Sequence, residues 1–198
     1  MFIQVIQGNT KDVDGLRRQF DRWQRELASG ATGYLGSTGG VADDGATIVL
    51  ARFENEEAAR ANSDRPEQGA WWNETAKYFD GDPTFRNCRE VDTTLAGGSD
   101  HAGFVQVVQG RATNRDRLRE LEAEFMPKII EQRPDVIGSL RGWDGDHFTE
   151  AIYFTSVAEA RKGESTMPDD GAQDFAEYQS LVEGITYIDL KDPWLHTA

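Results

Sequence analysis

The sequence has a single cysteine, three histidines and far fewer basic than acidic side chains. One cysteine, Cys88, excludes an intrachain disulfide and the paired-cysteine spacings of structural zinc sites. With 21 lysines and arginines against 35 aspartates and glutamates, the formal net charge is −14, which repels nucleic acid and anionic membranes. Apolar runs are far shorter than the roughly 20 residues that cross a bilayer. We therefore expect no metal, no nucleic-acid partner and no membrane association.

The same scarcity bears on location. A lone cysteine suits a reducing compartment, and the first residues, MFIQ, lack the charged and apolar regions of a signal peptide. We expect a cytoplasmic protein. Apolar residues make up 38% of the chain and aromatic residues 10%, enough for a packed core in 198 residues.

The chain is organised around a repeated segment. Residues 2–8 read FIQVIQG and residues 104–110 read FVQVVQG, so five of the seven positions are identical and two exchange Ile for Val. Matching landmarks recur at the same offset, in the pairs Gly36 and Gly138, Ser37 and Ser139, Pro66 and Pro168, and Gly69 and Gly171. Such self-similarity predicts a module written twice. We place the units at residues 1–95 and 103–198.

The first unit has the pattern β-α-β-β-α-β. The β-branched segment 2–7 suits a strand, and apolar residues at spacings of four, three and four between Leu16 and Leu27 indicate a helix. The remaining expected elements are strands at 34–40, 46–53 and 85–91, a short helix at 54–61, a helix at 67–79 and a linker at 92–103. This order is the ferredoxin-like, or split βαβ, arrangement.

One such unit leaves a face of its antiparallel sheet without helices. That face is apolar here and must be covered, and a second, similar unit covers it sheet against sheet. The predicted fold class is therefore α+β, with two fused ferredoxin-like units packing as an intrachain dimeric α/β barrel. The expected state is a monomeric pseudo-dimer, with a further homodimer left open.

Two segments carry a family resemblance: the strand at 2–7, and residues 53–72, FENEEAARANSDRPEQGAWW. They resemble the dimeric α/β-barrel superfamily, in particular the antibiotic-biosynthesis-monooxygenase-like proteins. In that family a strand ends in an aromatic residue, an acidic helix follows, and a second helix turns aromatic and polar groups toward a cavity. The superfamily includes cofactor-independent oxygenases, haem-degrading enzymes and proteins without an assigned role.

The resemblance implies a site on the helix at 67–79. Trp72 and Asn73 would be its catalytic pair, flanking a flat aromatic substrate, with Trp71 beside them. The alternative is that Trp72 packs with Phe79 in the core and that Asn73 is solvated. Haem-degrading relatives need a histidine on this helix, and none of the three histidines lies there. We expect no cofactor.

Other polar residues are candidates for substrate binding. Gln4 and its repeat Gln106 lie within apolar strands and need partners if buried. The partner is either a ligand in the cavity or, in the structural alternative, the glutamine of the other unit or a neighbouring backbone group. Arg52 and Tyr153 occupy matching strands. Tyr78 follows the tryptophans. His147 is a natural proton carrier, although the turn beside it argues for exposure.

The resulting functional expectation is a small-molecule enzyme of the monooxygenase-like kind, without metal or flavin, acting on an aromatic or polyketide-like substrate. An electron-rich substrate anion would react with oxygen while the protein supplies a dry cavity, orientation and a proton acceptor. The alternative is a non-catalytic small-molecule-binding or stress-associated protein, because one fold supports many functions.

Overall fold

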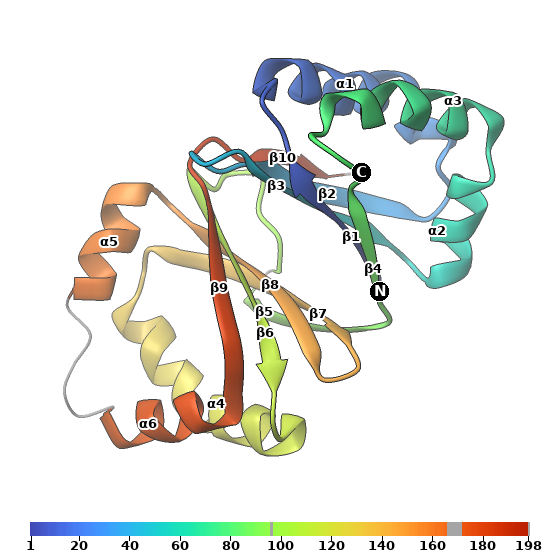
Figure 1. Cartoon of the computed structure of the whole chain (residues 1–198). Coiled ribbons are helices and arrows are strands. Elements are labelled where there is room, and N and C mark those ends of the chain that lie inside the picture. The colour runs from blue at the N-terminus through green and yellow to red at the C-terminus, as the bar shows by residue number, and fades with distance from the viewer. Residues whose placement is uncertain (96, 166–171, 198) are drawn as a thin grey trace.

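Two antiparallel five-stranded sheets face each other in the middle of the molecule, and the helices cover their outer sides (Figure 1). The computed structural model describes residues 1–95, 97–165 and 172–197, with side chains for all of these except residues 172–175. In Figure 1 helices α1, α2 and α3 lie over one sheet and helices α4, α5 and α6 over the other.

The elements of the first half are β1 (Phe2–Asn9), α1 (Val13–Glu26), β2 (Tyr34–Val41), β3 (Ala46–Phe53), α2 (Glu56–Ser63), α3 (Pro66–Thr75), β4 (Thr84–Cys88) and β5 (Glu90–Leu95). Those of the second half are β6 (Phe104–Ala112), α4 (Arg115–Gln132), β7 (Val136–Asp144), β8 (His147–Phe154), α5 (Val157–Ser165), α6 (Ala172–Leu181), β9 (Val182–Leu190) and β10 (Trp194–Thr197).

The first long helix of each half begins in the same way. Asp12 accepts a hydrogen bond from the backbone N–H of Gly15, and Asn114 accepts one from the N–H of Arg117. These caps satisfy amide groups that the helix itself leaves unpaired. Because α1 and α4 start at equivalent points, residues at the same distance from each cap occupy equivalent positions.

The two sheets also share their register. The first has the order β10-β2-β3-β1-β4 and the second β5-β7-β8-β6-β9. Tyr34 pairs with Phe53 in one and Val136 with Phe154 in the other, and each pairing shifts register immediately afterwards. The prediction of an α+β fold with two fused ferredoxin-like units is confirmed.

The fifth strand of each sheet comes from the opposite half of the chain. Strand β5 pairs with β7, and strand β10 pairs with β2. The expected linker at 92–103 was therefore wrong in its first part, because residues 92–95 continue a strand. The expected strand at 85–91 is divided between the two sheets. The boundaries 1–95 and 103–198 stay a prediction, and strand pairing crosses them.

A core formed by both sheets joins the halves. Its buried apolar members are Ile3, Val5, Ile48, Leu50, Cys88, Ala102, Val105, Val107, Leu140, Ala151, Tyr153, Ile188 and Leu190. Polar contacts cross the same interface: the Tyr153 hydroxyl lies 2.5 Å from Thr38 Oγ1, and Gln109 Nε2 donates to Gln7 Oε1 at 3.0 Å. The predicted packing of sheet against sheet within one chain is confirmed.

Candidate functional site

A buried ion triad lies between the second sheet and helix α4. Arg141 of β7 donates two hydrogen bonds to Glu122 of α4, both at 2.7 Å, and two to Glu150 of β8, at 2.9 and 2.6 Å. The three side chains are 9%, 15% and 12% exposed, respectively. Burial opposes the charge on Arg141, but the two carboxylates outweigh it and hold the pKa of Arg141 above its ordinary value.

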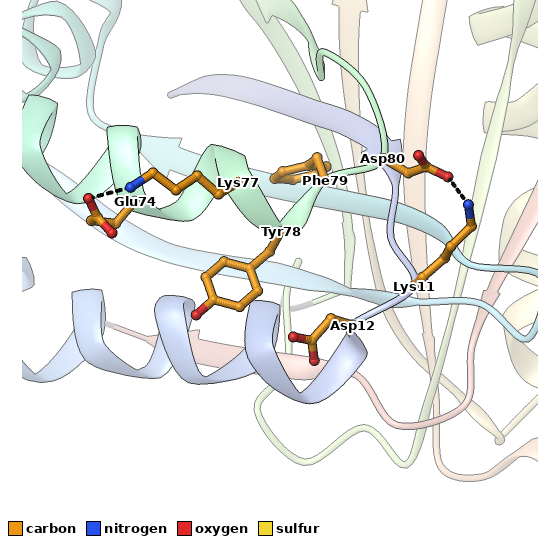
Figure 2. A pocket seen from close by; sticks show the side chains of 7 residues that line it. All are labelled: Lys11, Asp12, Glu74, Lys77, Tyr78, Phe79 and Asp80. Carbon is orange, nitrogen blue, oxygen red and sulfur yellow. Dashed lines mark hydrogen bonds and ion pairs between the residues drawn. The ribbon is translucent and has the colours of Figure 1, made fainter.

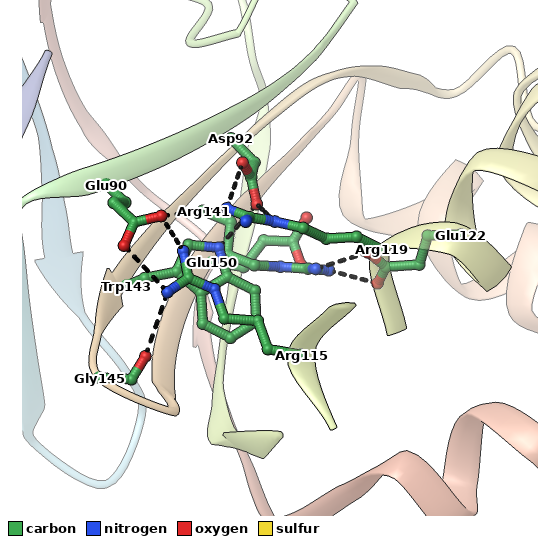
Figure 3. Close-up of polar contacts among 9 residues, drawn as sticks. All are labelled: Glu90, Asp92, Arg115, Arg119, Glu122, Arg141, Trp143, Gly145 and Glu150. Atoms are coloured by element: carbon green, nitrogen blue, oxygen red, sulfur yellow. Dashed lines mark hydrogen bonds and ion pairs between the residues drawn. The ribbon is translucent and has the colours of Figure 1, made fainter. Parts of the chain in front are cut away.

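A second layer of charge surrounds this triad (Figure 3). Asp92 of β5 accepts from Trp143 Nε1 at 2.6 Å and from Arg119 at 2.9 and 3.0 Å. Burial alone would raise the pKa of Asp92, but these hydrogen bonds lower it. The guanidinium of Arg115 stacks 4.3 Å from the Trp143 ring centroid and also binds Glu90. Strand β5, from the first half, therefore holds helix α4 of the second.

The triad forms one side of a cavity of about 400 Å³ between the sheet and the helices. Its apolar wall consists of Ala123, Phe125, Met126, Ile129, Ile130, Val136, Ile152 and Phe154. Its polar lining consists of Asp92, Thr94, Gln106, Glu122, Arg133, Ser139, Arg141, Glu150, Glu164 and Tyr178. An apolar wall combined with polar groups that can orient a ligand is typical of small-molecule sites.

Glu150 and Tyr178 each bring to this lining an oxygen atom that a ligand can bind. Glu150 binds Arg141 through Oε2 only, and its Oε1 has no hydrogen-bond partner among the described residues. The Tyr178 hydroxyl likewise has none within that part of the chain, while its ring meets Phe125 edge to face with centroids 6.3 Å apart. Burial raises the pKa of Tyr178 to about 12, so its hydroxyl stays protonated and can donate.

The first unit has apolar residues where the second has the triad. Gly39 and Val49 pair in the register that Arg141 and Glu150 occupy. Phe20 lies as far beyond the cap of α1 as Glu122 lies beyond that of α4. Its ring centroid lies 5.5 Å from that of Trp71 and 5.7 Å from that of Trp194. Trp194 pairs with Gly39 in the first sheet, just as Asp92 pairs with Arg141 in the second, so Trp194 and Asp92 occupy equivalent edge positions. An aromatic cluster thus replaces the charged one.

The tryptophans predicted at the site belong to this aromatic packing. Trp71 is buried, and its Nε1 donates to the Gln19 carbonyl at 2.9 Å. The Trp72 ring packs against Phe79 and Phe85, with centroid distances of 6.1 and 5.1 Å. Asn73 is exposed. None of the three predicted residues lines the cavity beside Arg141, which lies in the other unit.

Of the two predicted glutamines, Gln106 lines this cavity. Its Nε2 donates to Asp189 Oδ1 at 2.9 Å, and the equivalent Gln4 donates to Asn87 Oδ1 at 3.3 Å. Each therefore has a side-chain partner on the neighbouring strand, and neither of these bonds goes to the other glutamine or to a backbone group. Gln4 borders a separate hollow of the first unit.

Arg52 and Tyr153 lie at the interface between the two sheets. Arg52 is buried and donates to the His196 carbonyl at 3.0 Å. Tyr153 is fully buried against Thr38, and burial raises the pKa of its hydroxyl. The structure places both in contacts that join the halves, away from the residues lining the cavity.

Tyr78 borders a different hollow of about 410 Å³, shown in Figure 2. Salt bridges from Lys11 to Asp80 at 2.7 Å and from Lys77 to Glu74 at 2.8 Å surround it. Exposed, paired charges of this kind are a solvated surface. His147 is exposed at the start of β8, beside another polar hollow.

Sequence reasoning missed Glu122, Arg141, Glu150 and Tyr178. A signal for three of them was present, because the repeat aligns Glu122 with Phe20 and Arg141 with Gly39, and a one-residue slip brings Glu150 to Val49. Charged residues that replace apolar ones in the second copy mark the place where the halves differ chemically.

Within residues 1–95, 97–165 and 172–197, no three His, Cys, Asp or Glu side chains are grouped to hold a metal ion. Among the helices described, none has the length and apolar character needed to cross a membrane.

The fold of two fused ferredoxin-like units is shared with several solved structures. The chain is similar to a candidate monooxygenase from Lactobacillus acidophilus NCFM, with a TM-score of 0.75, 12% identity and coverage of 99% of this chain and 95% of that one. For a candidate monooxygenase from Fusobacterium nucleatum subsp. nucleatum the TM-score is 0.75 and the identity 9%. The match covers 99% of this chain and 94% of that one. The chain is also similar to an anthrone oxidase-like protein, with a TM-score of 0.66 and 13% identity. The match covers 98% of this chain and 92% of that one. No family model matches the chain, and no curated protein matches it significantly.

Proposed function

We propose that the chain is a cofactor-independent monooxygenase-like enzyme whose site is the cavity of the second unit. The supporting observation is the combination, in one space of about 400 Å³, of an apolar wall with the free Glu150 Oε1 and the Tyr178 hydroxyl. A flat, mainly apolar molecule with one acidic hydroxyl or enol fits this lining. The structural likeness to candidate monooxygenases and to an anthrone oxidase-like protein supports the same class.

The residues have separate roles in this proposal. Glu150 accepts the proton of the bound hydroxyl or enol. The anion that forms lies near Arg141 and receives a hydrogen bond from Tyr178, whose raised pKa keeps it a donor. The electron-rich anion then reduces oxygen. One oxygen atom enters the substrate as a new carbonyl, and the other leaves as water together with two substrate hydrogens.

Oxygen uptake with anthrone-like phenols tests this assignment. Glu150→Gln removes the proton acceptor while keeping the shape of the side chain, so we expect uptake to fall by about 100-fold or more. Tyr178→Phe should lower uptake less, since it removes one hydrogen bond to the anion. If the wild type takes up oxygen and Glu150→Gln takes it up at the same rate, the proposed site is contradicted.

The Trp72 and Asn73 site remains the competing proposal, and it supplies the control. A Trp72→Ala, Asn73→Ala double variant alters the first unit only, so uptake should persist if the second-unit cavity is the site. Loss of uptake in this variant alone would move the site to helix α3.

A non-catalytic small-molecule-binding protein is the second candidate. It is favoured by the engagement of Arg141, which among the described residues uses four of its five N–H donors on the carboxylates of Glu122 and Glu150. Binding of the same phenols without oxygen uptake would decide for it.

A further inference from the structure

The cavity beside Arg141 carries an excess of negative charge. Within the triad one guanidinium faces two carboxylates, so its formal charge is −1. The other cation in the lining, Arg133, is held by Asp135 through hydrogen bonds of 2.9 and 2.7 Å. Among the described lining residues, therefore, no cation lacks a carboxylate partner.

The groups around the triad do not reverse this balance. Taken by element, the other titratable and charged side chains around the triad and its cavity are Asp92 on β5, Arg119 on α4, Glu164 and Arg161 on α5, Tyr178 on α6 and Asp189 on β9. Arg161 is shared by Glu164 and Asp189, so it adds no unpaired cation. Arg119 is matched by Asp92, and the Tyr178 phenol is neutral. Within the triad the excess carboxylate is carried by Glu122 and Glu150, of which only Glu150 has an oxygen without a hydrogen bond to Arg141.

A ligand that arrives as an anion would add a second uncompensated charge to this partly buried space, where charges interact strongly. A ligand that arrives with its hydroxyl proton instead donates to Glu150 Oε1. When the proton then moves to Glu150, the negative charge passes from the carboxylate to the ligand, and the total charge in the cavity stays constant.

We infer that the site selects its ligand in the neutral, protonated form and excludes the ionised form of the same molecule. The inference rests on the cavity proposed above as the functional site and adds the charge state of the substrate. The chemical class is a neutral aromatic phenol or enol, as opposed to an aromatic carboxylate or a preformed phenolate.

The test uses two naphthols of matched size, one carrying an electron-withdrawing group that lowers its hydroxyl pKa toward neutrality. Binding to the wild-type protein is measured by titration calorimetry between pH 6 and pH 10. We expect the affinity for each naphthol to fall by about tenfold or more as the pH rises through that ligand's own pKa. The two midpoints should differ by the difference between the two ligand pKa values.

Two variants locate the effect. Glu150→Gln leaves one carboxylate against Arg141 and makes the triad neutral, so the loss of affinity on ligand ionisation should shrink markedly. Glu164→Gln removes another carboxylate of the same lining, which is 40% exposed and bound to Arg161, and the discrimination should persist because solvent screens that charge. Circular dichroism confirms that each variant is folded.

Three results would overturn the inference: equal affinity for both forms, tighter binding of the anion, or a midpoint that is the same for both naphthols. The wild-type series stands even if a variant fails to fold. Failure of the proposed function looks different, since selective binding of the neutral form can occur without oxygen uptake. Uptake with a fully ionised substrate would contradict the inference and the proton-accepting role of Glu150, but not the assignment as an oxygenase. Binding of neither form would count against the site itself.

Discussion

At the scale of single residues, Arg141 carries the largest predicted effect on stability. Arg141→Met leaves Glu122 and Glu150 buried without their shared cation, which costs about 3–5 kcal/mol in comparable buried pairs. Urea unfolding followed by fluorescence should show this loss as a lower free energy of unfolding.

The matched control replaces the whole triad by apolar residues, as the first unit does at Phe20 and Val49. Glu122→Leu, Arg141→Met and Glu150→Val together remove all three charges, and such replacements are often neutral or stabilising. We expect the triple variant to be more stable than Arg141→Met alone. If the triple variant is the less stable of the two, the cost does not come from unpaired charge.

The contrast between Trp72 and Arg141 shows how far residue-scale prediction reaches. The sequence predicts that Trp72 and Phe79 lie on one helix face, and their rings do pack together. It does not reveal that Glu122, Arg141 and Glu150 are buried, because glutamate and arginine are usually exposed and their pairing depends on contacts between α4, β7 and β8. Gln106 was found because its polar side chain interrupts an apolar strand.

At the scale of elements, the strands and helices with strong periodicity were predicted well, and β5 was not. Its sequence, EVDTTL, is mostly polar. This suits its place as an edge strand of the second sheet, where its side chains are partly exposed. Composition alone makes such a strand look like a linker. Its partner β7 belongs to the second half of the chain, more than forty residues further along, and no local sequence signal specifies that pairing.

Strand β5 holds helix α4 through Asp92, which gives an element-scale prediction. Asp92→Asn should lower the free energy of unfolding by only about 1 kcal/mol, because the carboxylate is 41% exposed. Hydrogen exchange at neutral pH should increase in α4 more than in α1.

The pH dependence of this loss has a defined sign. The pKa of Asp92 is lower in the folded protein than in the unfolded chain, so its contribution is present above the unfolded pKa of about 3.9. It disappears as the pH falls through the folded value, where wild type and variant should converge. The control is Glu183→Gln on β9, which removes an exposed salt bridge to Arg111 on β6 and should leave hydrogen exchange in α4 unchanged. A constant difference down to pH 2 would contradict a role of the ionised carboxylate.

At the scale of the whole molecule, the repeat in the sequence predicts that two units cover each other's sheets, and the structure has that arrangement. The exchange of β5 and β10 lies beyond such reasoning, because both strands lack a counterpart in a four-stranded ferredoxin-like unit. Their consequence is that neither sheet is built from one half of the chain.

Cleavage between the halves tests this interdependence. Asp100 and His101 are exposed, so a protease site inserted between them should be tolerated and cut in the folded protein. After cutting, β5 remains on the first fragment and pairs with β7 of the second, while β10 remains on the second fragment and pairs with β2 of the first. The fragments also share the core that includes Ile3 and Val105. We therefore expect the cut and uncut proteins to sediment alike, near the 22.1 kDa of the single chain, with separation only in denaturant. Two folded fragments that separate without denaturant would show that each half is complete by itself, which the crossed strand pairing makes physically unfavourable because each would lose an edge strand and expose the apolar face of its sheet.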